Sequence, residues 1–134
     1  MTEVVRDAMV AEPTVHGGGE TAQDAGRALD RDEVRAVLIC DDGRFVGVVT
    51  RKTLVREVVA SGRDPRTTPL REIAEEPNFT IRSDRPLDDA FRALEELDLE
   101  RVPVVDDGRL VGVLSRSAVQ RRLAEDEPPA DAEA

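Results

Sequence analysis

The sequence has very few aromatic, cysteine and histidine residues. Of its 134 residues, 2% are aromatic, none is Trp or Tyr, and there is one Cys and one His. The chain therefore lacks the stacking platforms that binders of single-stranded nucleic acid use. One Cys excludes an internal disulfide, and one Cys with one His excludes a Cys/His zinc site. The same scarcity leaves no nucleophile–base–orienter set, so we expect neither catalytic residues nor metal ligands.

Long hydrophobic runs and an excess of positive charge are also missing. The N-terminal segment MTEVVRDAMVAEP lacks the basic start and apolar core of a signal peptide, and no apolar stretch reaches the length of a membrane span. The formal net charge is −10, which disfavours nucleic acids and anionic membranes as partners. The cytoplasm is the expected compartment.

The chain does contain enough apolar residues to build a core. Hydrophobic residues make up 40% and charged residues 36% of the sequence, a balance typical of a soluble globular protein. A length of 134 residues allows one compact domain of ordinary size. Since aromatic residues are so rare, that core must consist mainly of Val, Leu, Ile and Ala.

The most informative feature is an internal repeat. The segment DDGRFVGVVTRKTLVREV, from Asp41 to Val58, returns without a gap as DDGRLVGVLSRSAVQRRL, from Asp106 to Leu123. A repeat of this strength indicates that one supersecondary unit is built twice and packs against its copy.

The second copy gives the clearer pattern. Its first part has the apolar spacing of an amphipathic helix with Pro86 at a tolerated early position, and Ser83 or Asp84 is the candidate cap. The apolar positions of this helix are Leu87, Ala90, Phe91, Leu94 and Leu97. A β-branched strand at 101–105 follows, and Asp107-Gly108 then supplies the chemistry of a tight hairpin turn. The return strand ends at Ser115, where a second helix begins.

The first copy lies 65 residues earlier, as Asp41 and Asp106 show. Its helical stripe is weaker, since it consists of Ala22, Ala25, Gly26 and Leu29. The turn becomes Asp42-Gly43 and the hydroxyl residue becomes Thr50. Further upstream a one-residue slip aligns Val15 with Ile81 as short extended segments.

Each copy is therefore predicted to have the order β-α-β-β-α. Together they predict an α+β fold with α/β-like character, in which two repeats pack as a pseudo-two-fold pair and helices cover small sheets. The expected bounds are 1–60 for the first repeat, with a lead-in helix from Thr2 to Met9, and 70–124 for the second. Residues 61–69 form the expected linker, and the acidic tail 125–134 is expected to be disordered.

These residues resemble a tandem pair of cystathionine-β-synthase (CBS) domains, the arrangement called a Bateman module. In the second copy RVPVVD at 101–106 is followed by GRLVGVLS at 108–115, which is similar to the family pattern of a Pro-containing strand, a glycine hairpin and a Ser or Thr. The first copy keeps Asp41, Gly43, Gly47 and Thr50, but it has Leu38 where the family has Pro. The resemblance covers roughly Val4 to Ala124.

The resemblance implies a regulatory module, here standing alone, that binds an adenosine-type nucleotide between its repeats. AMP, ADP, ATP and S-adenosylmethionine are the expected regulatory ligands, and no obligatory cofactor is expected. It also implies a homodimer formed through the repeat helices and an unidentified effector protein as partner. Family members that bind nucleotides usually carry Asp three positions after the hydroxyl residue, where it holds the ribose. Thr53 and Ala118 occupy these positions, and neither can hold a diol in bidentate fashion.

The candidate ligand-binding residues lie at the strand-to-helix junctions and in the strands beside them. They are Val15, His16, Val37, Thr50, Arg51 and Thr53 in the first copy, and Ile81, Arg82, Val102, Pro103, Ser115 and Arg116 in the second. A hydroxyl at a helix start, an exposed N–H group and a neighbouring Arg are suited to an anion. Thr50 and Ser115 are equally explained as helix caps, and the two arginines as surface charges.

Three further features of the sequence each have two interpretations. Gly47 and Gly112 allow the close approach either of another backbone or of a ligand. The loop His16-Gly17-Gly18-Gly19 suits either a phosphate cradle or a flexible connection. Cys40 is expected to be a small buried hydrophobe rather than a reactive thiol.

Two functions remain in competition. The first is a sensor of an adenosine-type nucleotide or related metabolite that signals to a partner, and the second is a ligand-free dimerisation or protein-interaction module. The hydroxyl-plus-Arg junctions favour the first, and the missing carboxylates at Thr53 and Ala118 favour the second.

Overall fold

A computed structural model describes residues 3–11 and 13–125. The chain divides into two compact units. We call Thr14–Asn78 with Gly108–Leu110 the first-repeat unit, and Phe79–Asp107 with the chain from Val111 onward and the N-terminal segment the second-repeat unit. Both units mix strands and helices, as the α+β prediction requires.

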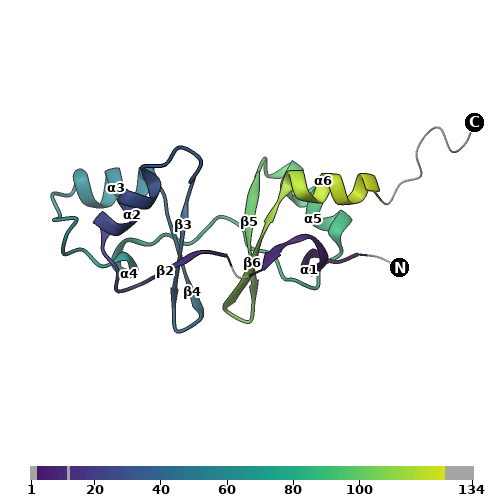
Figure 1. Ribbon diagram of the computed structural model, residues 1–134, viewed down its shortest axis with the longest axis horizontal. Helices are drawn as coiled ribbons and strands as arrows, with labels where there is room; N and C mark the ends of the chain where they lie inside the picture. The colour runs from purple at the N-terminus through teal and green to yellow at the C-terminus, as the bar shows by residue number, and fades with distance from the viewer. Residues whose placement is uncertain (1–2, 12, 126–134) are drawn as a thin grey trace, which may run out of the picture. The chain divides into compact units, whose positions relative to one another are not determined.

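The first-repeat unit is built on a three-stranded sheet. Strand β2 (Val15–Gly17) pairs in parallel with β3 (Val37–Asp41), which pairs antiparallel with β4 (Arg44–Val49). Helix α2 (Ala22–Leu29), α3 (Arg51–Leu54) with its π-helical continuation η1 (Val55–Val59), and α4 (Leu70–Ile73) lie on one side of these strands (Figure 1). The predicted β-α-β-β-α order is therefore present, with α4 as an additional helix.

The second-repeat unit repeats this plan with a different edge strand. Strand β5 (Arg101–Asp106) pairs with β6 (Arg109–Ser115), and β6 pairs antiparallel with β1 (Val10–Ala11). Helices α5 (Leu87–Glu96), α6 (Arg116–Glu125) and α1 (Val5–Ala8) complete the unit. The segment predicted to be extended at Ile81 makes a single parallel bridge to Val104 instead of a strand.

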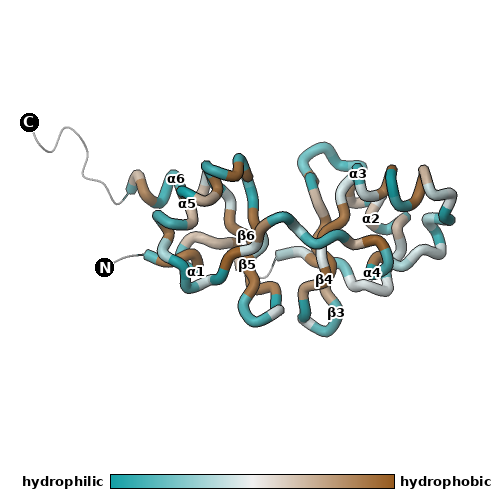
Figure 2. Tube along the Cα trace, turned by 180° about the vertical axis from the view of Figure 1, so that it is seen from behind, coloured by the Kyte–Doolittle hydropathy of each residue, from teal (hydrophilic) through white to brown (hydrophobic). Residues whose placement is uncertain are grey.

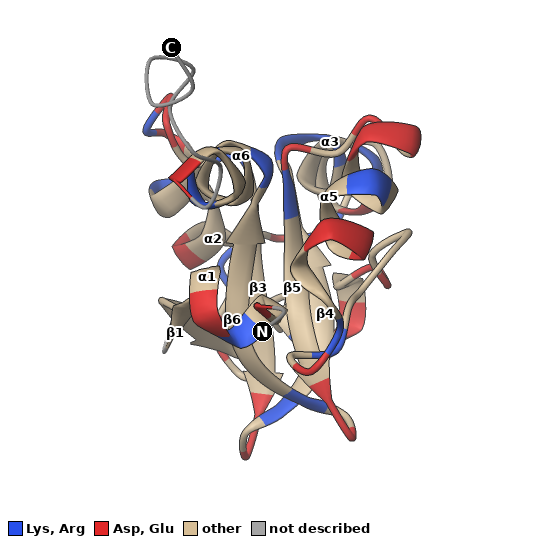
Figure 3. Ribbon diagram, turned by 90° about the vertical axis from the view of Figure 1, so that its right-hand side faces the viewer, with Lys and Arg blue, Asp and Glu red and all other residues tan. Residues whose placement is uncertain are grey.

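Both hairpins close with the predicted two-residue turn. Asp42 and Gly43 have φ values of 52° and 81°, and Asp107 and Gly108 have values of 51° and 81°. Positive φ at both central positions defines the turn type that matches strand twist, which is why Asp-Gly is favoured there. Acidic residues consequently mark the tips of both hairpins (Figure 3).

Each unit has its own aliphatic core, formed where the helices cover the sheet. The strands are largely hydrophobic and the connecting loops largely polar (Figure 2). In the first-repeat unit the buried cluster is Ala22, Ala25, Leu29, Val37, Ile39, Val49, Val58, Leu70 and Ile73. In the second it is Val5, Ile81, Leu87, Ala90, Leu94, Val102, Val104, Leu114 and Val119. Most positions of the helical stripes predicted from the sequence thus face these cores, but Gly26 is not part of the cluster and Leu97 is 51% exposed after the end of α5.

The helix starts differ in part from expectation. Thr21 caps α2 through reciprocal bonds with Asp24, in which the Asp24 N–H donates to Thr21 Oγ1 at 3.3 Å. Helix α5 begins after Pro86 without a side-chain cap, although Ser83 and Asp84 were the candidates. Ser83 instead bonds to Asp106, so its hydroxyl serves the strand rather than the helix.

The lead-in helix packs with the second repeat, although its position in the sequence predicts that it belongs to the first. Helix α1 is shorter than the expected 2–9, and Val5 is fully buried in the core of the second-repeat unit. The Val5 N–H donates to the Arg85 carbonyl at 2.9 Å, and the Leu87 N–H donates to the Glu3 carbonyl at 2.9 Å. Burial of Val5 among the apolar side chains of that unit accounts for this placement.

Helix α4 makes the matching contacts in the first-repeat unit. The Leu70 N–H donates to the Glu20 carbonyl at 2.8 Å, and the Ala22 N–H donates to the Thr68 carbonyl at 2.9 Å. Val4 pairs with Pro86 just as Pro69 pairs with Thr21. The repeat therefore extends upstream, and the segment before each repeat completes the core of the other repeat's unit.

Most of the predicted acidic tail lies outside the described residues. Glu125 is the last residue of α6, and 126–134 are not described. Among the helices of the described residues, none is long and apolar enough to cross a membrane.

Candidate functional site

The first-repeat junction is closed by two threonines. The Thr53 N–H donates to Thr50 Oγ1 at 3.2 Å, and the Thr50 N–H donates to Thr53 Oγ1 at 3.0 Å. The two hydroxyl oxygens are 3.0 Å apart, and Thr53 is fully buried. This reciprocal arrangement is a capping box, which satisfies two backbone donors at the helix start. Thr53 thus has a structural role in place of the carboxylate that the family resemblance would put here.

Arg51 binds the end of the preceding helix. Its Nη2 donates to the carbonyl of Leu29, the last residue of α2, and to the carbonyl of Arg31 at 2.8 Å. The last carbonyls of a helix have no intrahelical partner, and a cation near them also complements the helix dipole. Arg51 is therefore a C-terminal cap of α2 in this structure rather than an unengaged surface charge.

The second-repeat junction has the same plan with fewer bonds. The Ala118 N–H donates to Ser115 Oγ at 3.2 Å, and the methyl group of Ala118 cannot return a bond as Thr53 does. Arg116 lies 3.5 Å from Asp98 and 3.6 Å from Glu100, in the loop that follows α5. Arg51 thus bonds to the end of α2, whereas Arg116 pairs with carboxylates of the loop that follows α5.

The two junction glycines are explained by a neighbouring backbone. A Cβ built on Gly47 would lie 2.6 Å from the carbonyl oxygen of Glu75, and one built on Gly112 would lie 2.8 Å from the carbonyl oxygen of Val10. Gly47 also has a φ of 155°, a backbone conformation that residues with a side chain rarely adopt. Of the two interpretations left open by the sequence, close approach of another backbone is correct for both.

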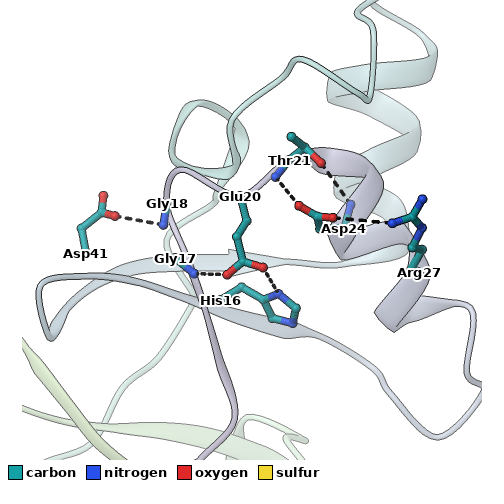
Figure 4. A network of polar contacts seen from close by, with 8 residues as sticks. All are labelled: His16, Gly17, Gly18, Glu20, Thr21, Asp24, Arg27 and Asp41. Atoms are coloured by element: carbon teal, nitrogen blue, oxygen red, sulfur yellow. Dashed lines mark hydrogen bonds and ion pairs between the residues drawn. The ribbon is translucent and has the colours of Figure 1, made fainter.

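The glycine loop is occupied by the chain's own carboxylates. The Gly17 N–H donates to Glu20 Oε2 at 2.6 Å, and the Gly18 N–H donates to Asp41 Oδ1 at 2.9 Å (Figure 4). His16 Nδ1 lies 3.1 Å from Glu20 Oε1. Two N–H groups that a phosphate would need are therefore engaged by negative groups, which also repel an anion. The phosphate-cradle interpretation of this loop is not supported.

The carboxylate of the last residue of β3 and that of the last residue of β5 each have a partner that sequence reasoning missed. Asp41 accepts from Arg71 Nε at 3.3 Å, and Asp106 accepts from Ser83 Oγ at 2.6 Å. Arg6 in turn donates to Ser83 Oγ at 3.3 Å. The signal was available, because Arg6 and Arg71 are separated by the same offset as Asp41 and Asp106.

These contacts shift the acidity of both carboxyl groups. The hydrogen bond from Arg71, with that from the Gly18 N–H, lowers the pKa of Asp41 below its ordinary value. The hydroxyl and N–H of Ser83 lower the pKa of Asp106 in the same way. Donors that bond the ionised carboxylate stabilise the charged form, so both groups hold their loops in place best when ionised.

The remaining candidates divide between core and surface. Val37, Ile81 and Val102 are at most 5% exposed, and their side chains belong to the two cores. Val15 is 44% exposed at the start of β2. Half-buried Pro103 accepts a bond from the Ile81 N–H at 3.2 Å. Arg82 is exposed and pairs with Asp84 at 3.4 Å and with Asp107 at 3.3 Å.

The candidate ligand-binding residues divide between the two units, as the internal repeat predicts. Val15, His16, Val37 and the three junction residues 50, 51 and 53 lie in the first-repeat unit, and the other six lie in the second. Within each unit the structure places the junction residues together at a helix start. The side chains of Val37, Ile81 and Val102 are buried in the cores, so these three residues offer only backbone atoms to a ligand.

Cys40 is half-buried near the end of β3. Burial, with a smaller effect of the neighbouring Asp41 carboxylate, raises the pKa of its thiol above the ordinary value. A raised pKa reduces the thiolate fraction and with it the nucleophilicity. Within residues 3–11 and 13–125, no group of three or more His, Cys, Asp and Glu side chains is arranged to hold a metal ion.

Comparisons with known proteins agree with the fold. The family profile for the CBS domain matches residues 5–60 and again residues 70–125. Hypoxic response protein 1 of Mycobacterium tuberculosis is 31% identical over 121 residues, which cover 90% of this chain and 85% of that protein.

Solved structures give the same result. A crystal structure of Hypoxic Response Protein I with two coordinated zinc ions superposes with a TM-score of 0.75 at 30% identity, over 91% of this chain and 99% of that one. The crystal structure of CBSX2 in complex with AMP superposes with a TM-score of 0.70 at 26% identity, over 92% and 97% of the two chains. The CBS domain pair of MJ0100, in complex with 5-methylthioadenosine and S-adenosyl-L-methionine, has a TM-score of 0.65 at 21% identity, over 95% and 100%.

Proposed function

The chain belongs to the CBS-domain family and carries two CBS domains in tandem, and we propose that it is a regulatory module that binds an adenosine-type nucleotide or a related metabolite. The family profile that matches both repeats is that of the CBS domain, and we propose a role in regulation without a chemical reaction. The observation that carries it is the match of the CBS family profile to both repeats, at residues 5–60 and 70–125. The complex of CBSX2 with AMP supports adenosine as the ligand class.

The arrangement of charges favours a ligand with little negative charge. Arg51 is bonded to carbonyl groups at the end of α2 and Arg116 is paired with two carboxylates, so neither binds a triphosphate without losing those contacts. The net charge of −10 adds a general repulsion of polyanions. We therefore propose AMP and S-adenosylmethionine as better ligands than ADP or ATP.

The module is also proposed to act as a homodimer and to pass its signal to an effector protein. A hexameric CBS-CP12 protein has a related fold, with a TM-score of 0.61 at 20% identity, which is consistent with association through such modules. The two proposals are independent, since a dimer can form with or without a nucleotide. They are accordingly tested by different measurements.

A ligand-free interaction module is the second candidate. The full burial of Thr53 and the methyl group of Ala118 favour it, because neither repeat presents a carboxylate to hold a ribose diol. The two candidates differ in one observable, which is whether an adenosine compound stabilises the folded chain.

A thermal-shift panel with AMP, ADP, ATP and S-adenosylmethionine tests the proposal. A ligand at a hundred times its dissociation constant adds about 2.7 kcal/mol to the free energy of unfolding. We expect AMP or S-adenosylmethionine to raise the melting temperature more than ATP does. If none of the four shifts it at millimolar concentration, the nucleotide proposal is wrong and the interaction module is preferred.

Two variants test where the ligand binds. The double variant Thr50→Ala, Arg51→Ala removes the two side chains of the first-repeat junction. We expect AMP to raise its melting temperature less than it raises that of wild type. Thr21→Ala is the matched control, since it removes a helix cap of similar worth, about 1 kcal/mol, at the start of α2. Equal AMP affinity in the double variant and in wild type would show that the junction is not the site.

A further inference from the structure

The second-repeat unit has an open hollow of about 220 Å³ between helices α1 and α6, both of which are labelled in Figure 1. Spacings of three and four residues put its α6 side chains on one face of that helix. Its lining consists of two residues of α1 and four of α6: Asp7, Ala8, Ala118, Arg121, Arg122 and Glu125. Pockets for drug-sized ligands have volumes of about 300–1,000 Å³. This α1–α6 hollow is smaller, so it suits a molecule of few heavy atoms.

Two alanines leave this space open. The residues of the first repeat that correspond to Ala8 and Ala118 are Ile73 and Thr53. Ile73 is 3% exposed and Thr53 is fully buried, so both of these larger side chains pack inside their unit. The second repeat has only methyl groups at the same positions. The α1–α6 hollow therefore follows from a difference in sequence between the two repeats.

Carboxylates outnumber cations around Arg122, which lines the hollow. Arg122 Nε donates to Glu3 Oε1 at 2.9 Å. This hydrogen bond raises the pKa of Arg122, and the charges of Asp7 and Glu125 add to the effect. Glu3 Oε2 is buried and has no hydrogen-bond donor among the described residues. Three carboxylates thus share one guanidinium, and their field attracts a further cationic group.

Arg121 gives the hollow a group that binds anions. Its side chain is exposed, and within residues 3–11 and 13–125 its guanidinium makes no hydrogen bond or ion pair. A guanidinium can bind one carboxylate through two parallel hydrogen bonds. The hollow therefore presents a cation and several carboxylates beside two methyl groups. A small molecule that carries both charges and a short apolar group matches this lining.

We propose that the α1–α6 hollow binds a small aliphatic α-amino acid. The carboxylate of the ligand pairs with Arg121, and its ammonium group lies beside Asp7 and Glu125. Its short side chain packs against the methyl groups of Ala8 and Ala118. The amino acid is a second ligand of the module, and the inference does not rest on nucleotide binding. Of the lining residues, only Ala118 belongs to a junction considered for the nucleotide.

An NMR titration of the full chain with L-alanine tests the inference. We expect saturable shifts of the amide signals of residues 7–8 and 118–125. Ethylamine is alanine without the carboxylate, and propionate is alanine without the ammonium group. Each lacks one charge-assisted contact and should bind at least about tenfold more weakly.

Three variants locate the site. Arg121→Gln changes an exposed side chain, so it should keep the circular dichroism spectrum of wild type and bind L-alanine at least about tenfold more weakly. Arg101→Gln is the matched control, because Arg101 is an exposed arginine of the same unit outside the hollow, and it should bind as wild type does. Ala8→Ile copies the first repeat and fills the hollow, so it should abolish the shifts caused by L-alanine.

The outcomes separate this inference from the nucleotide proposal. No saturable shift with L-alanine at tens of millimolar overturns it, and so does an equal affinity for ethylamine and L-alanine. Unchanged binding by Arg121→Gln or by Ala8→Ile overturns it as well. A wild-type chain that binds L-alanine at these amide positions but does not bind AMP refutes the nucleotide proposal and supports the amino-acid site.

Discussion

Replacing Gly47 with Ala tests the close approach between β4 and the segment that follows α4. The new Cβ would lie 2.6 Å from the carbonyl oxygen of Glu75 and 3.0 Å from its carbonyl carbon. Both atoms belong to the backbone, so no side-chain rotation relieves the collision. The φ of 155° adds strain, because a residue with a Cβ rarely adopts it.

The size of the fall in the free energy of unfolding follows from the contacts that the new Cβ disturbs. Val48 and Glu75 exchange two backbone hydrogen bonds of 2.8 and 2.9 Å, and each contributes about 1 kcal/mol net. If the segment moves away these bonds are lost, and if it stays the overpacking costs about 1–3 kcal/mol. With backbone strain of about 1 kcal/mol at the substituted residue, we expect the free energy of unfolding to fall by about 3 kcal/mol.

Urea unfolding followed by circular dichroism measures the effect. With a slope of about 2 kcal/mol per molar urea, the midpoint should fall by roughly 1.5 M. Gly19→Ala is the matched control, since its Cβ would lie 3.6 Å from Arg71 Nη2 without a positive φ, and its effect should stay within about 0.5 kcal/mol. Equal midpoints for Gly47→Ala and Gly19→Ala would refute the close approach.

Three further predictions concern acidity, the ligand and the second junction. The pKa of Asp106 is lowered in the folded state, so its stabilising effect is present above its ordinary pKa of about 3.9 and is lost as the pH falls through the lowered value. Asp106→Asn should therefore lower the urea midpoint at neutral pH and approach wild type in strong acid; a constant difference at all pH values contradicts this. Ala118→Asp places a carboxylate in the first turn of α6, where the helix dipole favours it, and should tighten AMP binding about tenfold if Ser115 adjoins the ribose. Calorimetric titration measures this, and an unchanged affinity removes the second junction from the site. Gly112→Ala should destabilise less than Gly47→Ala in the same urea assay, because its φ is not positive and two of the three atoms in its way belong to the flexible Met9 side chain; an equal loss would show that φ contributes nothing.

Local features of the fold could be predicted from the sequence. The Asp-Gly turns and the apolar stripe of α5 depend on neighbouring residues alone, and both are present as expected. The duplicated junctions were also found, because the repeat continues through them without a gap. The family resemblance added an expected class of ligand, which no local pattern contains.

Contacts between distant segments could not be predicted in the same way. Val5 is buried in the core of the second-repeat unit although it lies far from it in sequence, and a short helix gives no sign of the unit on which it packs. The role of Arg51 was likewise missed, because its partners are carbonyl groups that lie before β3 in the sequence. Thr53 contacts the nearby Thr50, and its role was missed for another reason: a hydroxyl near a helix start is equally compatible with a ligand and with a cap. Only the geometry shows that both side chains are already hydrogen-bonded.

Equilibrium dialysis of the wild-type chain against labelled AMP measures whether this CBS pair binds an adenosine compound. We expect saturable binding that unlabelled S-adenosylmethionine displaces and that ATP displaces less well. Retention of no AMP above background at millimolar concentration, by a chain that is folded by circular dichroism, would contradict it.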